Sequence, residues 1–331
     1  MRERIDVLGL GNSLVDLLAL ADDSFLSTQE MVKGAMTLID EDRAEALYAL
    51  GGHSTVMSGG SAANTVVGVA SFGVKAAYIG KVKHDALGET FRRDIRAAHV
   101  GYETSAAEHG PATGRCFVYI TPEGERTMNT FLGASTYLSP ADVDEELVRS
   151  ARFVYLEGYM WDRPDAKEAF RKAGRTARAA GARVSLTLSD SFCVDRFRGE
   201  FIDLMRSGIV DTVFANTDEA LALYETPHLH EAFDAFAKEG VTAAITRSEK
   251  GSVVIEGESR VEVPAFQIEK LVDTTGAGDL YASGFLAGLA LGKSNAGCAR
   301  LGALAAAEVI QHVGPRPLAS LQELAMREGL V

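Results

Sequence analysis

A glycine-rich segment, DTTGAGD at Asp273–Asp279, has the residue types and spacing that phosphoryl chemistry needs. Gly276 and Gly278 let the backbone approach a ligand without a side-chain clash, and a helical pattern, LYASGFLAGLALG, follows directly. The N–H groups of Gly276, Ala277 and Gly278 would then point outward at a helix N-terminus, where charge on a transferring phosphoryl group is stabilised. Asp279 could accept a proton from an attacking hydroxyl. Alternatively, the segment is a plain glycine turn with Asp279 as a helix cap.

Two other glycine-containing segments look similar to nucleotide-binding loops but lack required features. GLGNSL at Gly9–Leu14 follows a strand pattern, yet Leu14 stands where a dinucleotide-binding turn has its third glycine. GLALGKS at Gly288–Ser294 is one residue short of a P-loop and ends a helical pattern instead of opening one. We therefore assign neither segment to phosphate binding.

The segment DTTGAGDLYASGFLAGLA resembles the C-terminal signature of the ribokinase-like (PfkB) family of carbohydrate and nucleoside kinases. Other segments resemble further motifs of that family and follow in the family's order: GGSAANT at Gly59–Thr65, IGKVKHDALGE at Ile79–Glu89 and NTDEA at Asn216–Ala220. The resemblance extends from about Ile5 to about Leu318. It implies one kinase domain over residues 1–331, with a three-layer α/β fold, a central mostly parallel sheet and a small β lid built from about residues 25–39 and 113–131.

The resemblance also implies a role for individual residues. Asp279 would be the catalytic base, and Gly276, Ala277 and Gly278 would form the anion hole. The acceptor substrate would be bound by Asn12, Leu14, Asp16, Gly59, Gly60, Asn64 and Met160. ATP would be bound by Arg126, Asn216, Thr246, Ser248 and Gly251. Glu219 would hold Mg²⁺ through water, and the resemblance allows a monovalent cation such as K⁺ near Asp273 and Thr275.

The residue types agree with these roles. A carboxylate and an amide, as in Asp16 and Asn64, can grip a vicinal diol, because one accepts hydrogen bonds and the other both donates and accepts. Arg126 could close on the phosphates or be a solvated charge of its hairpin. Taken singly, Asp16 could cap a helix or turn, and Asn64 could be a helix residue whose side chain is hydrogen-bonded locally. Glu219 could be a solvent-exposed side chain.

Two residues depart from the family pattern. Lys83 and Ser248 stand where many family members have glycine. Lys83 could alter a wall of the cleft or lie on the surface, whereas Ser248 lies in the expected adenine-nucleotide loop, Thr246–Gly251. The identity of the phosphoryl donor is therefore left open.

Three segments are similar to the adenosine-kinase branch of the family: GNSLVDLLA at Gly11–Ala19, EGYMWD at Glu157–Asp162 and SLTLSDSFCVDRF at Ser185–Phe197. Their apolar residues would contact a purine base, with Leu14 packed on it and Met160 in an adjoining patch. Aromatic and thioether groups suit the π-face of a purine, although the patch could also be core.

We expect an adenosine kinase that uses Mg·ATP. The alternatives are a sugar kinase of the same family, ribokinase- or fructokinase-like, and a non-catalytic nucleoside- or sugar-binding sensor.

Short apolar segments alternate with helical patterns, as in a doubly wound parallel sheet. The predicted strands are Ile5–Leu10, Ala76–Ile79, Phe153–Leu156, Arg183–Leu188, Thr212–Phe214 and Val241–Thr246. The predicted helices include Asp165–Ala180, Glu200–Ser207 and Thr217–Tyr224, and the chain after Gly276 is expected to be nearly all helical. Phe25–Ile39 and Thr113–Phe131 look instead like short strands with turns, which could be a cover over a cleft or edge hairpins.

The composition excludes several other functions. With 33 Lys and Arg against 46 Asp and Glu, the net charge is −13, which disfavours nucleic acid and anionic membranes as partners. The apolar segment Leu280–Ile310 is interrupted by Lys293 and Arg300, so its parts are too short to span a bilayer. The small molecules above remain the expected partners, and the chain could be a monomer or a homodimer.

The cysteines and the amino-terminal segment indicate the compartment. Cys116, Cys193 and Cys298 are far apart without a CxxC pair, which fits buried thiols in a reducing cytosol. MRERIDVLGLG passes directly into a strand pattern without the features of a signal peptide. A cytoplasmic location is therefore expected.

Overall fold

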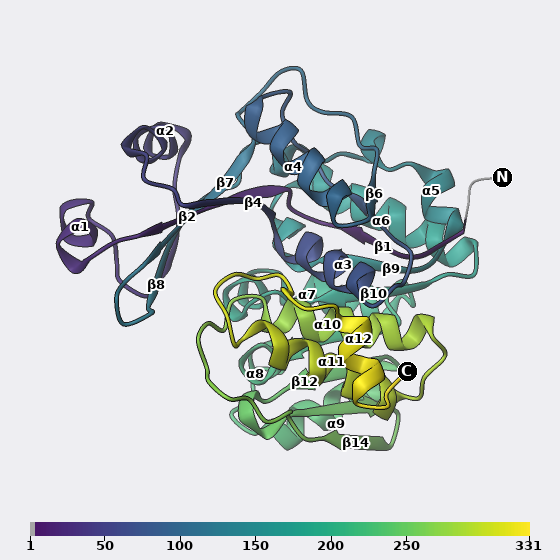
Figure 1. Ribbon diagram of the computed structural model, residues 1–331. Helices are drawn as coiled ribbons and strands as arrows, with labels where there is room; N and C mark the ends of the chain where they lie inside the picture. Colours follow the sequence, from purple (N-terminus) through teal and green to yellow (C-terminus); the bar gives the residue numbers. More distant parts are fainter. Residues whose placement is uncertain (1–3) are drawn as a thin grey trace.

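The computed structural model describes residues 4–331, whose strands form two separate sheets (Figure 1). The larger sheet consists of β1 (Ile5–Leu10), β5 (Ala76–Ile79), β6 (Val100–Tyr102), β9 (Ala151–Glu157), β10 (Arg183–Thr187), β11 (Thr212–Asn216), β12 (Thr242–Thr246), β13 (Ser252–Glu256) and β14 (Ser259–Val263). Their order across the sheet is β14-β13-β12-β11-β10-β9-β1-β5-β6. Neighbouring strands are parallel, apart from the antiparallel pairs β12–β13 and β13–β14.

The apolar sequence of β1 from Val7 to Leu10 follows from its place inside the sheet. It is paired with β5 on one side and β9 on the other, where Gly9 is opposite Tyr78 and Tyr155. Alternate side chains of a strand point to opposite faces, so Val7 and Leu8 belong to different buried clusters. A parallel strand that is covered on both faces needs apolar residues at nearly every position.

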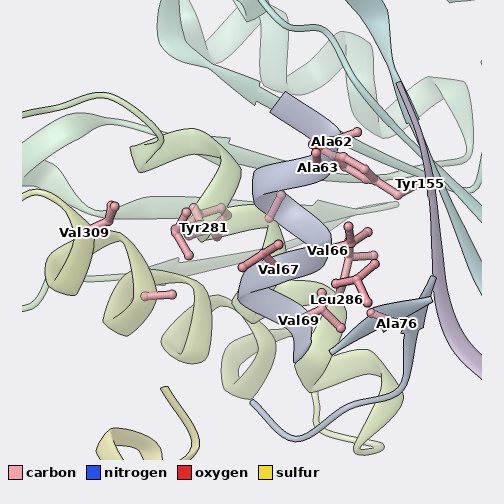
Figure 2. Packing of buried hydrophobic residues seen from close by; sticks show 14 of the residues in the cluster. Ala62, Ala63, Val66, Val67, Val69, Ala76, Tyr155, Tyr281, Leu286 and Val309 are labelled. Carbon is pink, nitrogen blue, oxygen red and sulfur yellow. The ribbon is translucent and has the colours of Figure 1, made fainter. Parts of the chain in front are cut away.

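Helices cover both faces of the larger sheet and complete three layers. One buried cluster joins the sheet to α3 (Ser61–Ser71), α4 (Ala86–Ala97), α10 (Ala277–Ala290), α11 (Asn295–Val309) and α12 (Leu321–Arg327). The other cluster joins it to α5 (Glu145–Ser150), α6 (Pro164–Ala179), α7 (Ser191–Arg206), α8 (Thr217–Tyr224) and α9 (Leu229–Glu239). Figure 2 shows Val66 and Val69 of α3 near Leu286 of α10, within the first cluster. The predicted three-layer α/β fold is confirmed.

The second sheet extends away from this body, together with α1 (Asp23–Thr28) and α2 (Glu41–Leu50) (Figure 1). It consists of β2 (Leu14–Leu20), β3 (Met36–Leu38), β4 (Thr55–Gly59), β7 (Gly114–Ile120) and β8 (Arg126–Phe131), in the order β3-β8-β7-β2-β4. β7 and β8 are an antiparallel pair, as the hairpin pattern of Thr113–Phe131 predicts. The fold therefore has a large, mostly parallel sheet and a smaller second one.

The prediction for Phe25–Ile39 was only partly correct. Its first part belongs to the helix α1, because the Asp22 side chain accepts a hydrogen bond from the Phe25 N–H at 2.8 Å and caps that helix. Only Met36–Leu38 forms a strand, and β2 and β4 supply the rest of the second sheet. Likewise, the helix predicted over Glu200–Ser207 is the second part of a longer helix, α7, which begins at Ser191 and is capped by Asp190.

Other elements agree closely with the sequence patterns. β1, β5 and α8 have the predicted bounds, and the remaining predicted strands differ at their ends by two residues or fewer. The free thiols of Cys116, Cys193 and Cys298 are buried, as expected. Within residues 4–331, no helix is both long enough and apolar enough to cross a bilayer.

Candidate active site

A cavity of about 940 Å³ lies between the two sheets, at the carboxyl ends of several strands of the larger one. This is the edge at which open α/β sheets bind their ligands. Most of the predicted site residues line the cavity: Asn12, Leu14, Asp16, Gly60, Asn64, Arg126, Asn216, Glu219, Thr246, Gly276, Ala277, Gly278 and Asp279. The structure thus brings together residues that are more than 260 positions apart in the sequence.

The glycine-rich loop opens α10, as the sequence predicts. Gly276 is the N-cap residue with a φ of 79°, in the left-handed region that favours glycine. A Cβ there would lie 2.8 Å from Cα of Pro315, so the loop also packs closely on the chain after α11. The Ala277 N–H donates to the Thr274 carbonyl at 3.2 Å. An anion at this end of α10 would therefore be bound by the remaining N–H groups of the first turn, which have no acceptor within the helix.

Asp279 lies in the first turn of α10 and is held by two side chains of α3. Its Oδ1 accepts a hydrogen bond from Ser61 Oγ at 2.6 Å, and its Oδ2 accepts one from Asn64 Nδ2 at 3.2 Å. Burial raises the pKa of Asp279 to about 6, although these two hydrogen bonds act in the opposite direction. A carboxylate of this pKa is ionised at pH 7 and can accept a proton from a hydroxyl.

Asp16 reaches the same cavity from β2 of the second sheet. Burial raises its pKa to about 6, the positive charges of Arg316 and Arg126 oppose the rise, and Asp279 adds to it. Gly59, a predicted substrate contact, does not line the cavity but makes room for this carboxylate. A Cβ at position 59 would lie 2.4 Å from Asp16 Oδ2.

Asn12 follows β1 and is almost fully enclosed by protein partners. Its Nδ2 donates to Glu157 Oε1 at 2.7 Å, and its Oδ1 accepts from Ser135 Oγ at 2.8 Å. Glu157 is 1% exposed and also accepts the Ala62 N–H at 2.8 Å, which ties β1 and β9 to the start of α3. Burial raises the pKa of Glu157 to about 7, while the hydrogen bonds from Ala62 and Asn12 lower it.

The sequence analysis did not include Glu157 among the site residues. A lone acidic residue directly after an apolar strand could have indicated it, because the carboxyl end of a parallel strand faces the ligand site.

Asn216 and Glu219 form a reciprocal cap at the start of α8. Asn216 Oδ1 accepts the Glu219 N–H at 2.9 Å, and Glu219 Oε2 accepts the Asn216 N–H at 3.0 Å. Glu219 is 5% exposed rather than solvated. Burial raises its pKa to about 7; the Asn216 N–H lowers it, and the negative charges of Asp190, Asp218 and Asp279 raise it further.

The carboxylates at this cavity fit Mg²⁺ only as single ligands, not as a complete protein site. Asp190, Glu219 and Asp279 all line the cavity, and a divalent cation would relieve the repulsion that Glu219 experiences. Mg²⁺ keeps several waters and usually binds one or two carboxylates together with substrate phosphates. Within residues 4–331, no group of three or more His, Cys, Asp and Glu side chains could hold a metal by itself.

Arg126 projects from β8 and pairs with Asp273 of the glycine-rich loop, at 2.5 Å between Nη2 and Oδ2. Asp273 also accepts the N–H groups of Thr275 and Gly314, each at 3.0 Å. Because the positive charge of the guanidinium already balances this carboxylate, a monovalent cation there would lack a negative charge of its own. While Arg126 is paired with Asp273, the arrangement near Asp273 and Thr275 does not fit K⁺.

Met160 does not line the cavity, so the expected contact of this residue with the purine is corrected. It is 3% exposed and packs in the cluster beneath α6 and α7, together with the fully buried Trp161. Tyr159 lines the cavity instead, with its hydroxyl donating to the Ser189 carbonyl at 3.2 Å. Leu14 and Phe192 also line the cavity, and Phe192 is 64% exposed.

Of the expected adenine-nucleotide loop, Thr246–Gly251, only the first residue lines the cavity. Thr246 lines it, whereas Ser248 and Gly251 do not. Ser248 has a φ of 52°, a left-handed conformation that glycine adopts more easily, which agrees with the glycine of many family members at this position. Lys83 also lies away from the cavity, and its Nζ donates to the Gly110 carbonyl at 3.0 Å.

A sequence model described as the pfkB family of carbohydrate kinases matches residues 33–321. The crystal structure of an adenosine kinase from Sinorhizobium meliloti is 52% identical, covers 98% of this chain and 99% of its own, and has a TM-score of 0.92.

Two further relatives are described as kinases of different substrates. A structure described as a probable sugar kinase from Rhizobium etli is 51% identical, covers both chains completely and has a TM-score of 0.93. The adenosine kinase of Saccharomyces cerevisiae is 28% identical over 92% of this chain and 95% of its own.

Proposed function

The chain belongs to the pfkB family of carbohydrate kinases, and we propose that it transfers the γ-phosphoryl group of ATP to the 5′-hydroxyl of adenosine. One observation carries the proposal. An ionisable carboxylate, Asp279, lies in the first turn of α10, in a cavity that Asp16 and Asn64 also line. The similarity to the adenosine kinase of Sinorhizobium meliloti supports adenosine as the acceptor.

In the proposed reaction, Asp279 takes the proton of the 5′-hydroxyl while that oxygen forms a bond to the γ-phosphorus. The bond from the γ-phosphorus to the β–γ bridging oxygen breaks, and ADP leaves. The pKa of about 6 keeps Asp279 ionised at neutral pH. The N–H groups at the start of α10 stabilise the charge on the phosphoryl oxygens because they already point at that charge.

Asp16 and Asn64 would hold the ribose hydroxyls. Asp16 reaches the cavity from the second sheet and Asn64 from α3, so a bound diol would join the two parts of the molecule. We propose that the second sheet acts as a lid, whose closure excludes the water that would otherwise accept the phosphoryl group. The exposed ring of Phe192 and the apolar Leu14 would face the purine.

The donor side would use Arg126, Asn216 and Thr246, at the ends of β8, β11 and β12, and Glu219, in the first turn of α8; all four line the cavity. Glu219 would hold Mg²⁺ through water, and the ion would neutralise charge on the β- and γ-phosphates. Arg126 would exchange Asp273 for a phosphate oxygen. We further propose a cytoplasmic role in purine salvage, because the reaction turns a free nucleoside into a nucleotide.

The alternative is a sugar kinase with the same machinery, which the likeness to the probable sugar kinase of Rhizobium etli supports. Release of ADP from Mg·ATP should be measured with adenosine, inosine, guanosine, ribose and fructose at equal concentrations. The proposal predicts the fastest release with adenosine and AMP as the second product. Faster release with a sugar would favour the alternative, and no release with any of the five would contradict both.

A further inference from the structure

A buried arginine outside the predicted site, Arg316, is connected to the catalytic base through one side chain. It follows α11 between Pro315 and Pro317 and is 8% exposed. Its Nε donates to Asn64 Oδ1 at 3.2 Å. Its Nη1 forms an ion pair with Asp94 Oδ2 at 3.0 Å, so α3, α4 and the chain after α11 meet at this guanidinium.

The contacts of Asn64 leave its amide only one orientation. A guanidinium has donors and no acceptor, so the atom of Asn64 beside Arg316 must be the carbonyl oxygen. An ionised carboxylate has acceptors and no donor, so the atom beside Asp279 Oδ2 must be the amide nitrogen. Rotating the amide by half a turn would place an oxygen against Asp279 and an NH₂ against Arg316, and both contacts would become repulsive.

The position of Arg316 is itself fixed from several sides. Asp94 Oδ2 also accepts the N–H of Ser58 at 2.7 Å, which links the ion pair to β4 of the second sheet. The neighbouring Gly314 N–H donates to Asp273 at 3.0 Å, and Pro315 packs on Gly276. The guanidinium is therefore anchored both to the second sheet and to the glycine-rich loop.

We propose that Arg316 is a positioning residue that holds Asn64 with its NH₂ toward Asp279 and the acceptor hydroxyl. The inference rests on the proposed function, since it concerns the same base. The inference assigns a direction to the hydrogen bonds. A ribose hydroxyl beside Asn64 accepts a hydrogen bond from the amide NH₂ and can donate its own proton to a carboxylate. Burying a guanidinium is costly unless it is paired, and here the pairing connects Asp94 to Asn64 and so to the base.

The test is a double-mutant cycle on kcat/KM with Arg316→Ala, Asn64→Ala and the double variant. If Arg316 acts through Asn64, Arg316→Ala should lower kcat/KM at least about tenfold when Asn64 is present and less than about threefold when residue 64 is already alanine. Equal effects in the two backgrounds, or no effect of Arg316→Ala, would overturn the proposal. The same cycle on adenosine affinity, measured by calorimetry, requires no turnover.

Two further variants separate positioning from folding. Arg316→Lys keeps a cation for Asp94 but lacks the planar fork that reaches Asn64, so it should unfold near the wild-type temperature and still lose rate. Arg152→Ala is the matched control, because Arg152 pairs with Asp6 at 2.9 Å and with the Ala290 carbonyl at 2.8 Å, at the opposite end of β9 from Glu157.

The Arg152→Ala variant should retain the wild-type rate, and low millimolar guanidinium should restore rate to Arg316→Ala alone. Equal losses in Arg152→Ala and Arg316→Ala would show a general effect on folding and contradict the proposal. Failure of the wild-type chain to phosphorylate adenosine would contradict the proposed function. If the wild type is active but the effects of the two substitutions on kcat/KM are additive, only the role of Arg316 is contradicted.

Discussion

Replacing Asp279 by asparagine removes the proposed base while preserving the contacts around it. The carboxylate accepts hydrogen bonds from Ser61 Oγ at 2.6 Å and Asn64 Nδ2 at 3.2 Å. An asparagine can present its oxygen to Asn64 and its NH₂ to Ser61, because a hydroxyl can accept as well as donate. The variant should therefore fold and bind adenosine, with an affinity within about threefold of wild type because both hydrogen bonds are retained.

The expected loss of rate is large. A positioned general base contributes roughly 10²- to 10⁴-fold, so kcat should fall by that factor, which corresponds to a barrier higher by ~3–5 kcal/mol. Binding energy contributed by Asp16 and the apolar walls is not affected. The change should thus appear in kcat and not in the affinity for the nucleoside.

The same substitution should stabilise the fold at high pH. Burial raises the pKa of Asp279 from 3.8 to about 6, so the folded protein binds this proton more tightly than the unfolded chain. The wild type therefore loses stability as the pH rises from about 4 to about 6, by up to ~3 kcal/mol from this group. A neutral asparagine side chain carries no such cost, so the variant should be the more stable protein at pH 8 and equal to wild type at pH 4.

Three measurements decide the prediction for Asp279→Asn: ADP release under saturating substrates, adenosine binding by calorimetry, and urea unfolding at pH 4 and pH 8. Turnover within about tenfold of wild type would remove Asp279 from the base role. Lost turnover together with lost adenosine binding would mean that the residue positions the substrate and would refute the reasoning from the two hydrogen bonds.

The other predictions concern the donor side, the pH profile and the core. Arg126→Gln should lower kcat/KM for ATP about 10- to 100-fold, since a hydrogen bond to a charged group is worth ~1.5–3 kcal/mol; unchanged initial rates would argue against a phosphate contact. Glu219→Gln should raise the Mg²⁺ concentration for half-maximal rate several-fold, and an identical Mg²⁺ titration would contradict that role. Because Asp279 must be ionised to accept a proton, kcat/KM for adenosine should rise as the pH increases through about 6, and a flat profile from pH 5 to 8 would oppose it. Met160→Ala should lower the free energy of unfolding by ~2–4 kcal/mol and leave KM for adenosine within about twofold, whereas a tenfold rise would return Met160 to the substrate site.

Local chemistry explains what the sequence could predict about the site. The loop of Gly276 and the helix after it follow from glycine spacing and a continuous helical pattern, both of which are read within twenty residues. The strand β1 follows from its apolar residues, which are continuous from Val7 to Leu10. In these places the short-range pattern and the long-range packing require the same residues.

Residues that depend on distant partners could not be predicted in this way. The 3₁₀ segment Gly158–Asp162 directs Tyr159 to the cavity and Met160 to the core, and its sequence contains no period that would distinguish them. β2 carries Asp16 within an apolar segment and was missed because its pairing partners lie about 40 and 100 positions away. Arg316 is connected to Asn64 across 252 positions, so only the fold brings them together.

The most direct test of the proposed function is a competition between adenosine and ribose for limiting Mg·ATP in one reaction, with the two phosphorylated products separated by mass. The ratio of products gives the ratio of kcat/KM. The apolar walls of the cavity, with Leu14 and Phe192, predict that AMP exceeds ribose phosphate by about 100-fold or more. Contacts with the purine that are worth ~3 kcal/mol would supply this selectivity. An excess of ribose phosphate would contradict adenosine as the acceptor.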